Sequence, residues 1–300
     1  MQTFKIKVPG SSANIGPGFD CVGLAISVYL EVECILNDNQ DLFAFNLKGE
    51  GSDIVKDLEC NFIYKSLYHS LADKSLINKI TINAKNEIPL QAGMGSSGAA
   101  IVAGVALAFL LESKAFDKNF IFKKALEIET HPDNIIASIF GGFNIVTDPE
   151  NIKFKKLVLD DDLYLTCIIP QLQTSTKAAR EVLPSQFSMK ETVLNTSHMA
   201  YLTASLLTKD YNSIKEGLKY NFHEEARAKL IPNYFEILQE LRQSKEAYGV
   251  YISGSGPVIA AFCNKKSRIG ELGVSLFYDK NINARFELIS PDNEGLIINN

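Results

Sequence analysis

Three glycine-rich segments of this chain, 8–20, 88–99 and 252–257, have the residue types that hold phosphate groups. In the middle segment, Gly93, Gly95 and Gly98 surround two serines immediately before a long apolar stretch. Glycine lets the backbone approach a ligand closely, and the N-terminus of a following helix presents unpaired N–H groups to an anion. The serines are suited to donate to phosphate or bind Mg²⁺, but serines also cap helices. This segment alone favours both interpretations about equally.

The middle segment also matches the G-x-G-x-x-G pattern of dinucleotide-binding proteins, but its context differs. That pattern follows a hydrophobic strand, and a second strand ending in an acidic residue comes about 20 residues later. Here Pro89-Leu90-Gln91-Ala92 leads into the glycines, and the region around Asp117 continues into another predicted helix. The P-loop Gly-Lys-Ser/Thr and the protein-kinase motifs His-Arg-Asp and Asp-Phe-Gly do not occur in the sequence. We therefore expect phosphate binding by another type of loop, with a dehydrogenase as a formal alternative only.

A second group of chemically active side chains lies in residues 127–134, E-I-E-T-H-P-D-N. Carboxylates and imidazoles bind metals and transfer protons. Each also has a structural interpretation, because Asp133 or Asn134 is suited to cap the next helix and His131 to be a buried, hydrogen-bonded imidazole. For any one of them alone, the structural interpretation is favoured. Glu127 precedes a loop in a chain with a predicted phosphate loop, so it is a candidate Mg²⁺ ligand.

The hydrophobic pattern around these segments predicts strands and helices in both halves of the chain. Predicted strands cover 4–8, 23–36, 77–88, 163–170, 249–262 and 284–289, and predicted helices cover 98–111, 120–130, 134–140, 192–218 and 234–247. A polar stretch at 147–162 predicts a domain boundary. We expect an α+β fold with antiparallel sheets, in two domains that cover 1–155 and 156–300.

Composition narrows the classes of protein. The 300 residues are 46% hydrophobic and 22% charged, with a net charge of −5, so we expect no nucleic-acid or anionic-lipid partner. The five cysteines lack metal-site spacing, which predicts reduced thiols. The N-terminus lacks the apolar core of a signal peptide, and the longest apolar run, 98–111, is shorter than the ~20 residues of a membrane span. These features predict a cytoplasmic protein.

The ordered motifs resemble those of the GHMP kinase superfamily, which includes galactokinase, homoserine kinase, mevalonate kinase and phosphomevalonate kinase, and most closely those of the homoserine kinases. P-G-S-S-A-N-I-G-P-G-F-D-C-V-G-L-A is similar to the opening signature of the homoserine kinases. I-P-L-Q-A-G-M-G-S-S-G-A is similar to the superfamily's ATP loop, and H-P-D-N-I-I-A-S-I-F-G-G to its central motif. I-S-G-S-G-P and R-A-K-L-I-P-N-Y-F resemble C-terminal motifs. Two positions depart from the family pattern, Met94 where Leu is usual and Gly98 where Ala is usual.

The resemblance implies a fold and a reaction. The fold has an N-terminal domain like the second domain of ribosomal protein S5, a ferredoxin-like C-terminal domain and an active site between them. The reaction is ATP- and Mg²⁺-dependent phosphorylation of the side-chain hydroxyl of L-homoserine to O-phospho-L-homoserine, in threonine biosynthesis, and the family suggests a homodimer. Two alternatives stay open: a sister kinase for another small alcohol such as mevalonate or shikimate, and a catalytically inactive nucleotide-binding module.

The resemblance also assigns residues by position. Ser97 and Glu127 match the Mg²⁺-linked residues of the family. The nucleotide site is matched by Asn61, Pro89, Leu90, Gln91, Ala92, Gly93, Met94, Gly95, Ser96, Ser97, Gly98 and Ala99. The homoserine pocket is matched by Asn14, Asp20, His131, Asn134, Arg180 and Arg227.

These residue types suit an amino-acid substrate. Two arginines are able to clamp a carboxylate, Asp20 to pair with an ammonium group and Asn14 to hold the reacting hydroxyl. Mevalonate kinase-like relatives have an aspartate where this chain has Asn134, and an amide is not a general base. We therefore expect phosphoryl transfer without a protein base, with Asn14, Ser97, Glu127 and Asn134 as the catalytic residues.

Overall fold

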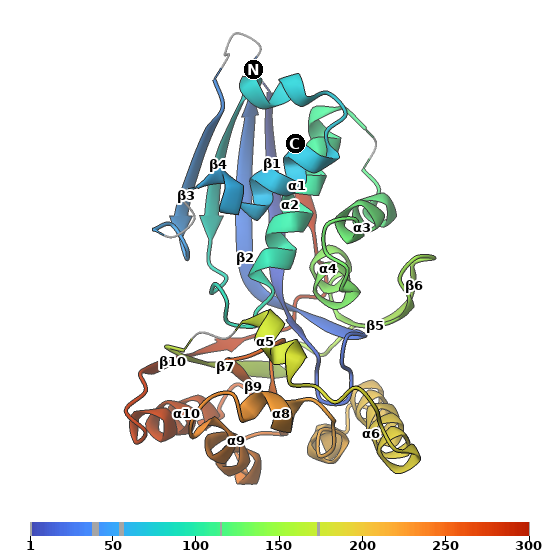
Figure 1. The fold of residues 1–300 in the computed structure, drawn as a ribbon, viewed down its shortest axis with the longest axis vertical. Coiled ribbons are helices and arrows are strands. Elements are labelled where there is room, and N and C mark those ends of the chain that lie inside the picture. The colour runs from blue at the N-terminus through green and yellow to red at the C-terminus, as the bar shows by residue number, and fades with distance from the viewer. Residues whose placement is uncertain (1, 38–41, 54–56, 115, 173–174, 300) are drawn as a thin grey trace.

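The structure is a computed structural model that describes residues 2–37, 42–53, 57–114, 116–172 and 175–299. These residues form a seven-stranded sheet in the upper half of Figure 1 and a four-stranded sheet in the lower half. The first sheet has the order β11-β1-β2-β4-β3, with β5 joining β2 to β6, and the second has the order β10-β7-β9-β8. The strands of the first sheet are β1 (Gln2–Ala13), β2 (Val22–Leu36), β3 (Ala44–Gly49), β4 (Ile80–Asn86), β5 (Phe143–Asp148), β6 (Lys153–Leu157) and β11 (Ile297–Asn299). Those of the second are β7 (Tyr164–Pro170), β8 (Gly249–Ile252), β9 (Ile259–Cys263) and β10 (Ala284–Ile289).

Helices cover one face of the first sheet, and most helices of the second group lie below the second sheet in the view of Figure 1. The first group is α1 (Phe62–Ser70), α2 (Ser96–Leu111), α3 (Lys118–Leu126) and α4 (Pro132–Phe140). The second group is α5 (Thr176–Glu181), α6 (Met189–Leu207), α7 (Ile214–Gly217), α8 (Glu224–Ala228), α9 (Tyr234–Gln243) and α10 (Ile269–Tyr278). Short 3₁₀ turns lie at Leu58–Cys60, Lys74–Lys79 and Tyr211–Ser213. The α+β prediction is therefore confirmed.

Helix α2 is apolar on all faces because it is covered on all sides. It packs on β1 and β2 and is covered in turn by α1, α3 and α4. At Gly104 a Cβ atom would overlap Ser66 Oγ and the Ile63 carbonyl, so glycine is what allows α1 to approach this closely. None of the described helices combines the length and hydropathy needed to cross a membrane.

Several element predictions were wrong in detail, each for a local reason. Strands β3 and β4 are parallel, not antiparallel, because the chain between them passes through α1 as a crossover. The predicted helix 192–218 ends at Leu207, where the following turn places Lys209 at φ 57°. The predicted strand 249–262 is divided into β8 and β9 by a turn. The elements that the pattern did not reveal are β3, β5, β6, β11, α1, α5, α8 and α10.

The two sheets do not divide the sequence into two continuous parts. The chain passes from the first sheet to the second between β6 and β7, but β11 returns and pairs antiparallel with β1. The main hydrophobic core is also continuous across both sheets, because it includes Ile26 of β2 as well as Tyr251 of β8 and Phe262 of β9. The division into 1–155 and 156–300 stays a prediction, and residues 297–299 lie in the first sheet.

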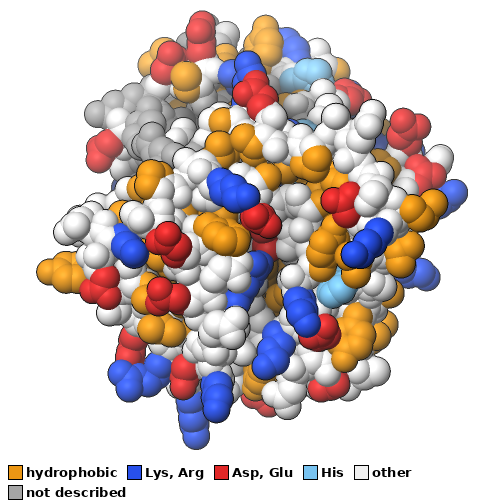
Figure 2. All heavy atoms as spheres, turned by 60° about the horizontal axis from the view of Figure 1, so that its bottom comes forward, with side chains coloured by type: hydrophobic (Ala, Val, Ile, Leu, Met, Phe, Trp, Pro, Cys, Tyr) orange, Lys and Arg blue, Asp and Glu red, His pale blue; other side chains and the backbone are white. Residues whose placement is uncertain are grey.

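Figure 2 shows the lower face of the molecule, which includes part of the second group of helices. Acidic and basic side chains are interspersed there, with hydrophobic side chains between them. The charges on this face are therefore mixed locally, in line with the small net charge of −5.

Candidate active site

The predicted nucleotide loop connects β4 to α2 and lies where the two sheets meet. Gly93 and Gly95 have φ values of 84° and 73°, the left-handed region that favours glycine, and Gly95 is the N-cap of α2. Ser97 is exposed in the first turn of α2. This helix start therefore presents backbone N–H groups and a hydroxyl to an anion, as the glycine pattern predicts.

Hydrogen bonds from β1 and from the segment between β8 and β9 hold this loop in place. Ser11 N of β1 donates to Met94 O at 3.0 Å, and Val258 N donates to Ala92 O at 3.1 Å. Ser253 Oγ donates to Gly93 O at 2.6 Å. A rigid support of this kind keeps the helix start open for a ligand.

The third glycine segment, 252–257, supports the loop instead of adding a second phosphate cradle. A Cβ atom on Gly93 would overlap the Ser253 carbonyl, so the two glycine-rich segments touch backbone to backbone. Gly254 N also donates to Ala13 O at 2.8 Å. This close approach therefore favours glycine at positions 93 and 254.

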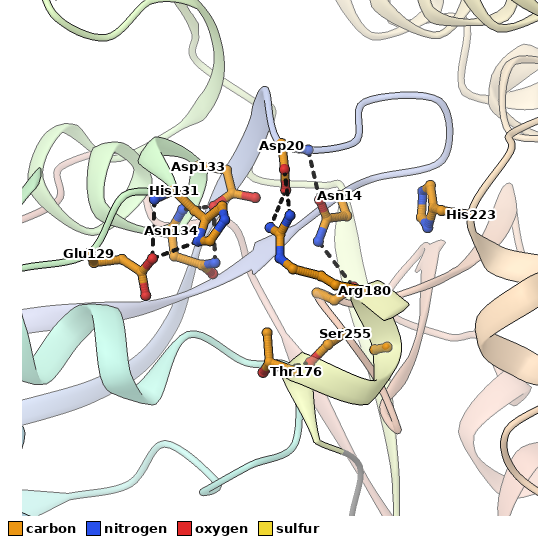
Figure 3. Close-up of polar contacts among 12 residues, drawn as sticks. Asn14, Asp20, Glu129, His131, Asp133, Asn134, Thr176, Arg180, His223 and Ser255 are labelled. Carbon is orange, nitrogen blue, oxygen red and sulfur yellow. Dashed lines mark hydrogen bonds and ion pairs between the residues drawn. The ribbon is translucent and has the colours of Figure 1, made fainter. Parts of the chain in front are cut away.

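Asp20 and Arg180 form an ion pair, with Arg180 Nη2 and Nη1 at 2.7 and 2.9 Å from the two carboxylate oxygens (Figure 3). We call the region around this pair, between the nucleotide loop, the β1–β2 loop, the start of α4 and α5, the cleft. Asp20 lies in the loop between β1 and β2, whereas Arg180 belongs to α5. Asn14 Oδ1 accepts from Asp20 N at 2.8 Å, and Asn14 Nδ2 donates to Gly254 O at 3.1 Å. Arg180 Nε is buried and has no hydrogen-bond partner among the described residues.

Arg227 lies deeper, on α8. Its Nε donates to Ala179 O at 3.2 Å and its Nη1 to Gly254 O at 2.8 Å. Burial and the charge of Arg180 lower the pKa of Arg227 to about 10. The ring of Phe19 lies 5.4 Å from the Arg180 guanidinium and 5.0 Å from that of Arg227. The two predicted clamp arginines therefore share one aromatic neighbour.

The start of α4 brings a second group of polar side chains to this cleft. His131 Nδ1 lies 2.6 Å from Glu129 Oε1, which also accepts from His131 N. Asp133 is buried, and its Oδ1 accepts from Asn134 N at 2.8 Å. Burial raises the pKa of Asp133 to about 6, and the nearby charge of Asp20 adds to this shift. Figure 3 shows this group beside the Asp20–Arg180 pair.

Asn134 links this group to the nucleotide loop. Its Oδ1 accepts from Ser11 Oγ at 2.9 Å. A Cβ atom on Gly98 would lie 3.1 Å from Asn134 Cβ, so the starts of α2 and α4 are in close contact. Asn14, Asp20, His131, Asn134 and Arg180 therefore face the cleft that the nucleotide loop borders.

Two predicted residues have other partners. Glu127 is half exposed at the end of α3, where its Oε2 lies 2.9 Å from Lys124 Nζ and 3.1 Å from His69 Nε2. The hydrogen bond from Lys124, followed by that from His69, lowers the pKa of Glu127. Asn61 is buried as the N-cap of α1, where its Oδ1 accepts from two backbone N–H groups. The described residues contain no group of three or more His, Cys, Asp or Glu side chains arranged for a metal ion.

Sequence reasoning did not single out several residues that line or support this cleft. Phe19 belongs to the opening signature and Glu129 to the acidic segment 127–134, but neither was predicted to have a role. Asp133 was predicted only as a candidate helix cap, whereas the N-cap of α4 is His131. Thr176 Oγ1 lies 3.4 Å from Ser255 Oγ and so connects α5 to the third glycine segment. His223 precedes Arg227 by four residues, a spacing that places two side chains on one helix face.

The chain is similar to known kinases over both of its halves. The family description "GHMP kinases N terminal domain" matches residues 61–142, and "GHMP kinases C terminal" matches residues 202–277. Kinases of this family use ATP. A homoserine kinase of Caldanaerobacter subterraneus subsp. tengcongensis is 33% identical over 97% of this chain and 94% of its own length. A homoserine kinase of Aquifex aeolicus is 35% identical over 89% of each chain.

Comparison with solved structures also finds homoserine kinases and other kinases of this fold. The crystal structure of homoserine kinase from Cytophaga hutchinsonii superposes with a TM-score of 0.87 at 28% identity, covering 100% of this chain and 98% of that one. A mevalonate kinase of L. major shares the fold, with a TM-score of 0.72 at 16% identity over 96% of each chain. The fold and loop thus define a small-molecule kinase of the GHMP type. Within that class, the chain belongs to the homoserine kinase family.

Proposed function

We propose that this protein transfers the γ-phosphate of ATP to the side-chain hydroxyl of L-homoserine, giving the O-phospho-L-homoserine used in threonine biosynthesis. The observation that carries this proposal is the Asp20–Arg180 ion pair beside Asn14, in a cleft bordered by the nucleotide loop. The full-length relatives named homoserine kinase support it independently.

The ion pair suits a zwitterionic substrate. An amino acid has one carboxylate and one ammonium group. When it binds, Arg180 would pair with the carboxylate and Asp20 with the ammonium group, and these contacts would replace the ion pair between the two side chains. Both side chains are about one-third exposed, at 32% and 30%, and are therefore accessible from the cleft. A hydroxy acid such as mevalonate would supply the carboxylate but leave Asp20 without a cationic partner. An unpaired, partly desolvated charge is costly, so the pair favours homoserine over mevalonate.

The ATP phosphates would bind at the start of α2. The N–H groups of the first turn and the Ser97 hydroxyl would contact them, and Gly93 and Gly95 leave room for this approach. Asn61 would contact the adenine base of ATP through its Nδ2 atom, because its Oδ1 atom already caps α1.

A bound Mg²⁺ would neutralise charge on the ATP phosphates. We propose Ser97 and one glutamate of the segment before α4 as the residues that hold it. Glu127 was predicted from the family pattern, and it would have to leave Lys124 and His69. Glu129 uses Oε1 for both of its contacts with His131, which leaves Oε2 for a cation. Glu129 is therefore the second candidate.

The hydroxyl proton needs an acceptor, and Asn134 cannot act as one because its side chain is an amide. Asn14 and Asn134 would hold the substrate in line with the γ-phosphate, and the proton would pass directly to that phosphate group. Phosphoryl transfer has a loose transition state, so positioning and charge neutralisation supply most of the rate.

The test is a coupled assay of ADP release with MgATP and a panel of alcohols: L-homoserine, D-homoserine, L-serine, mevalonate and shikimate. Turnover confined to L-homoserine is the expected result. Turnover on another alcohol would keep the kinase assignment but contradict the proposed pocket. ATP binding without turnover on any of these alcohols would instead favour a nucleotide-binding module. Sedimentation of the same preparation would test the homodimer that the family resemblance implies.

A further inference from the structure

His223 is a fully buried histidine with two defined partners in different segments of the cleft. Its Nε2 lies 2.7 Å from Gly16 O, and its Nδ1 lies 3.3 Å from Arg227 Nη1. A carbonyl oxygen only accepts and a guanidinium only donates. His223 must therefore carry its proton on Nε2 and accept on Nδ1, which makes it a neutral ring of one tautomer.

We propose that His223 is a positioning residue for the kinase reaction, which fixes the loop of residues 14–20 and the Arg227 guanidinium relative to each other. This inference rests on the proposed function, since Asp20 and Asn14 are proposed substrate contacts and Arg227 is a predicted residue of the homoserine pocket. His223 acts through these residues and is not itself a proposed substrate contact. In Figure 3 it lies at the side of the cleft, beyond Asn14.

The loop needs such a support because its backbone is strained. Asn14 and Asp20 have φ values of 58° and 56°, in the left-handed region that residues other than glycine rarely adopt. Gly16, at φ 53°, adopts the same region without a steric penalty. Strained conformations persist only where several contacts determine them. Here His223 holds Gly16 O, and Asn195 Nδ2 of α6 holds Pro17 O at 3.0 Å.

The other partner of His223 connects to the rest of the pocket. Arg227 donates to Ala179 O, which directly precedes Arg180, and to Gly254 O, which also accepts from Asn14 Nδ2. Phe19, from the same loop, lies 5.3 Å from the His223 ring and 5.0 Å from the Arg227 guanidinium. A change at His223 would therefore reach both ends of the proposed substrate site.

The chemistry of the two contacts selects the test variants. Leucine would fill part of the same space but would leave Gly16 O without its donor and Arg227 Nη1 without one of its acceptors. Glutamine carries one donor and one acceptor on its amide and so preserves both roles. His223→Gln is therefore the conservative variant, and His223→Leu is the disruptive one. His198→Leu, on α6, is a matched control, because His198 Nδ1 contacts only the Leu194 carbonyl of its own helix among the described hydrogen bonds.

The experiment measures KM for L-homoserine and for MgATP in the parent and the three variants. We expect His223→Leu to raise the homoserine KM about tenfold or more, with the MgATP KM changed less than twofold. In His223→Gln the homoserine KM should return most of the way to the parental value, and in His198→Leu both KM values should match those of the parent. An unchanged homoserine KM in His223→Leu would overturn the inference. The inference would also be overturned if His223→Leu raised both KM values equally and His223→Gln did not restore them, because that result indicates a general folding defect.

Amide hydrogen exchange gives a readout that does not depend on the substrate. Faster exchange at residues 16–22 in His223→Leu than in the parent and in His223→Gln would support the positioning role. Equal exchange in all three proteins would overturn it. A parent that does not phosphorylate homoserine would contradict the proposed function alone, and hydrogen exchange would still decide whether His223 fixes the loop.

Discussion

The carboxylate of Asp20 and the guanidinium of Arg180 meet across the cleft in a two-pronged ion pair, although 160 residues separate them in the sequence. The hydrogen bonds that Arg180 donates to the Asp20 carboxylate raise the pKa of Arg180. The pair joins the β1–β2 loop to α5, and it presents the two charges that an amino-acid substrate needs. Its proposed exchange for substrate charges leads to the first two predictions.

Arg180→Ala should impair homoserine use far more than ATP use. Loss of one arginine from a partly buried carboxylate contact costs about 1.5–3 kcal/mol, or roughly ten- to a hundredfold in kcat/KM. Steady-state kinetics with each substrate varied in turn would measure this. Arg268→Ala is a suitable control, because Arg268 pairs with Glu271 on the exposed surface. An unchanged kcat/KM for homoserine would remove Arg180 from the pocket.

Asp20→Asn should raise the homoserine KM and weaken the preference for a free ammonium group. In the parent, N-acetyl-L-homoserine should be a much poorer substrate than L-homoserine, because it leaves Asp20 without a cation. In Asp20→Asn this difference should shrink. If Asp20→Asn instead abolishes turnover while homoserine binds normally, Asp20 is the general base and direct proton transfer to the phosphate is contradicted.

The two glutamates before α4 can be separated by their effect on magnesium dependence. The variant at the residue that holds Mg²⁺, either Glu127→Gln or Glu129→Gln, should raise the magnesium concentration needed for half-maximal activity. The other variant should change this concentration little. Titration of Mg²⁺ at fixed ATP would decide between them. Equal, near-parental values in both variants would exclude both glutamates as ligands.

Gly93→Ala should disrupt the nucleotide loop. The new methyl group would overlap the Ser253 carbonyl, and φ at this position is 84°, so we expect about 1–3 kcal/mol of destabilisation and a higher KM for ATP. Gly98→Ala is the matched control within the same loop. Its methyl group would lie 3.1 Å from Asn134 Cβ, and alanine favours the first turn of α2, so its effect should be small. Denaturant unfolding and ATP kinetics would test both variants, and equal effects would contradict the prediction.

His223 and Asp133 should contribute to stability with opposite pH dependence. Burial lowers the pKa of His223 from 6.5 to about 4, an effect that Arg227 strengthens and Glu224 opposes. Between these values the unfolded chain binds more protons at this residue, so its contribution to stability falls as the pH drops from 6.5 to 4. Burial raises the pKa of Asp133 from 3.8 to about 6, so its contribution is present at low pH and is lost as the pH rises through 6.

Urea unfolding of the parent, His223→Gln and Asp133→Asn across this pH range would test the signs. The stability of the parent relative to His223→Gln should increase with pH, with a slope of about one proton at most. Its stability relative to Asp133→Asn should decrease with pH over the lower part of the range. Differences that do not change with pH would show that these groups titrate normally.

The local hydrophobic pattern of the sequence predicted those helices and strands whose burial follows a regular pattern. Helix α2 is buried on every face, and the first half of β1 and the middle of β2 alternate between buried and more exposed side chains, so their residue types reflect their surroundings directly. Short or mostly exposed elements such as β3 and β11 carry little pattern, because pairing with a distant strand decides their conformation. The crossover through α1 likewise decides that β3 is parallel to β4.

The class of the protein follows from the sequence alone, through the resemblance of its ordered motifs to those of the GHMP kinases. The same resemblance assigned many of the residues near the cleft. Which of these residues contact one another depends on the tertiary structure. It paired Asp20 with Arg180, gave Glu127 to Lys124 and His69, and set His223 between Gly16 and Arg227. Spacing along the chain does not encode such contacts, because they depend on how the two sheets and their helices pack together.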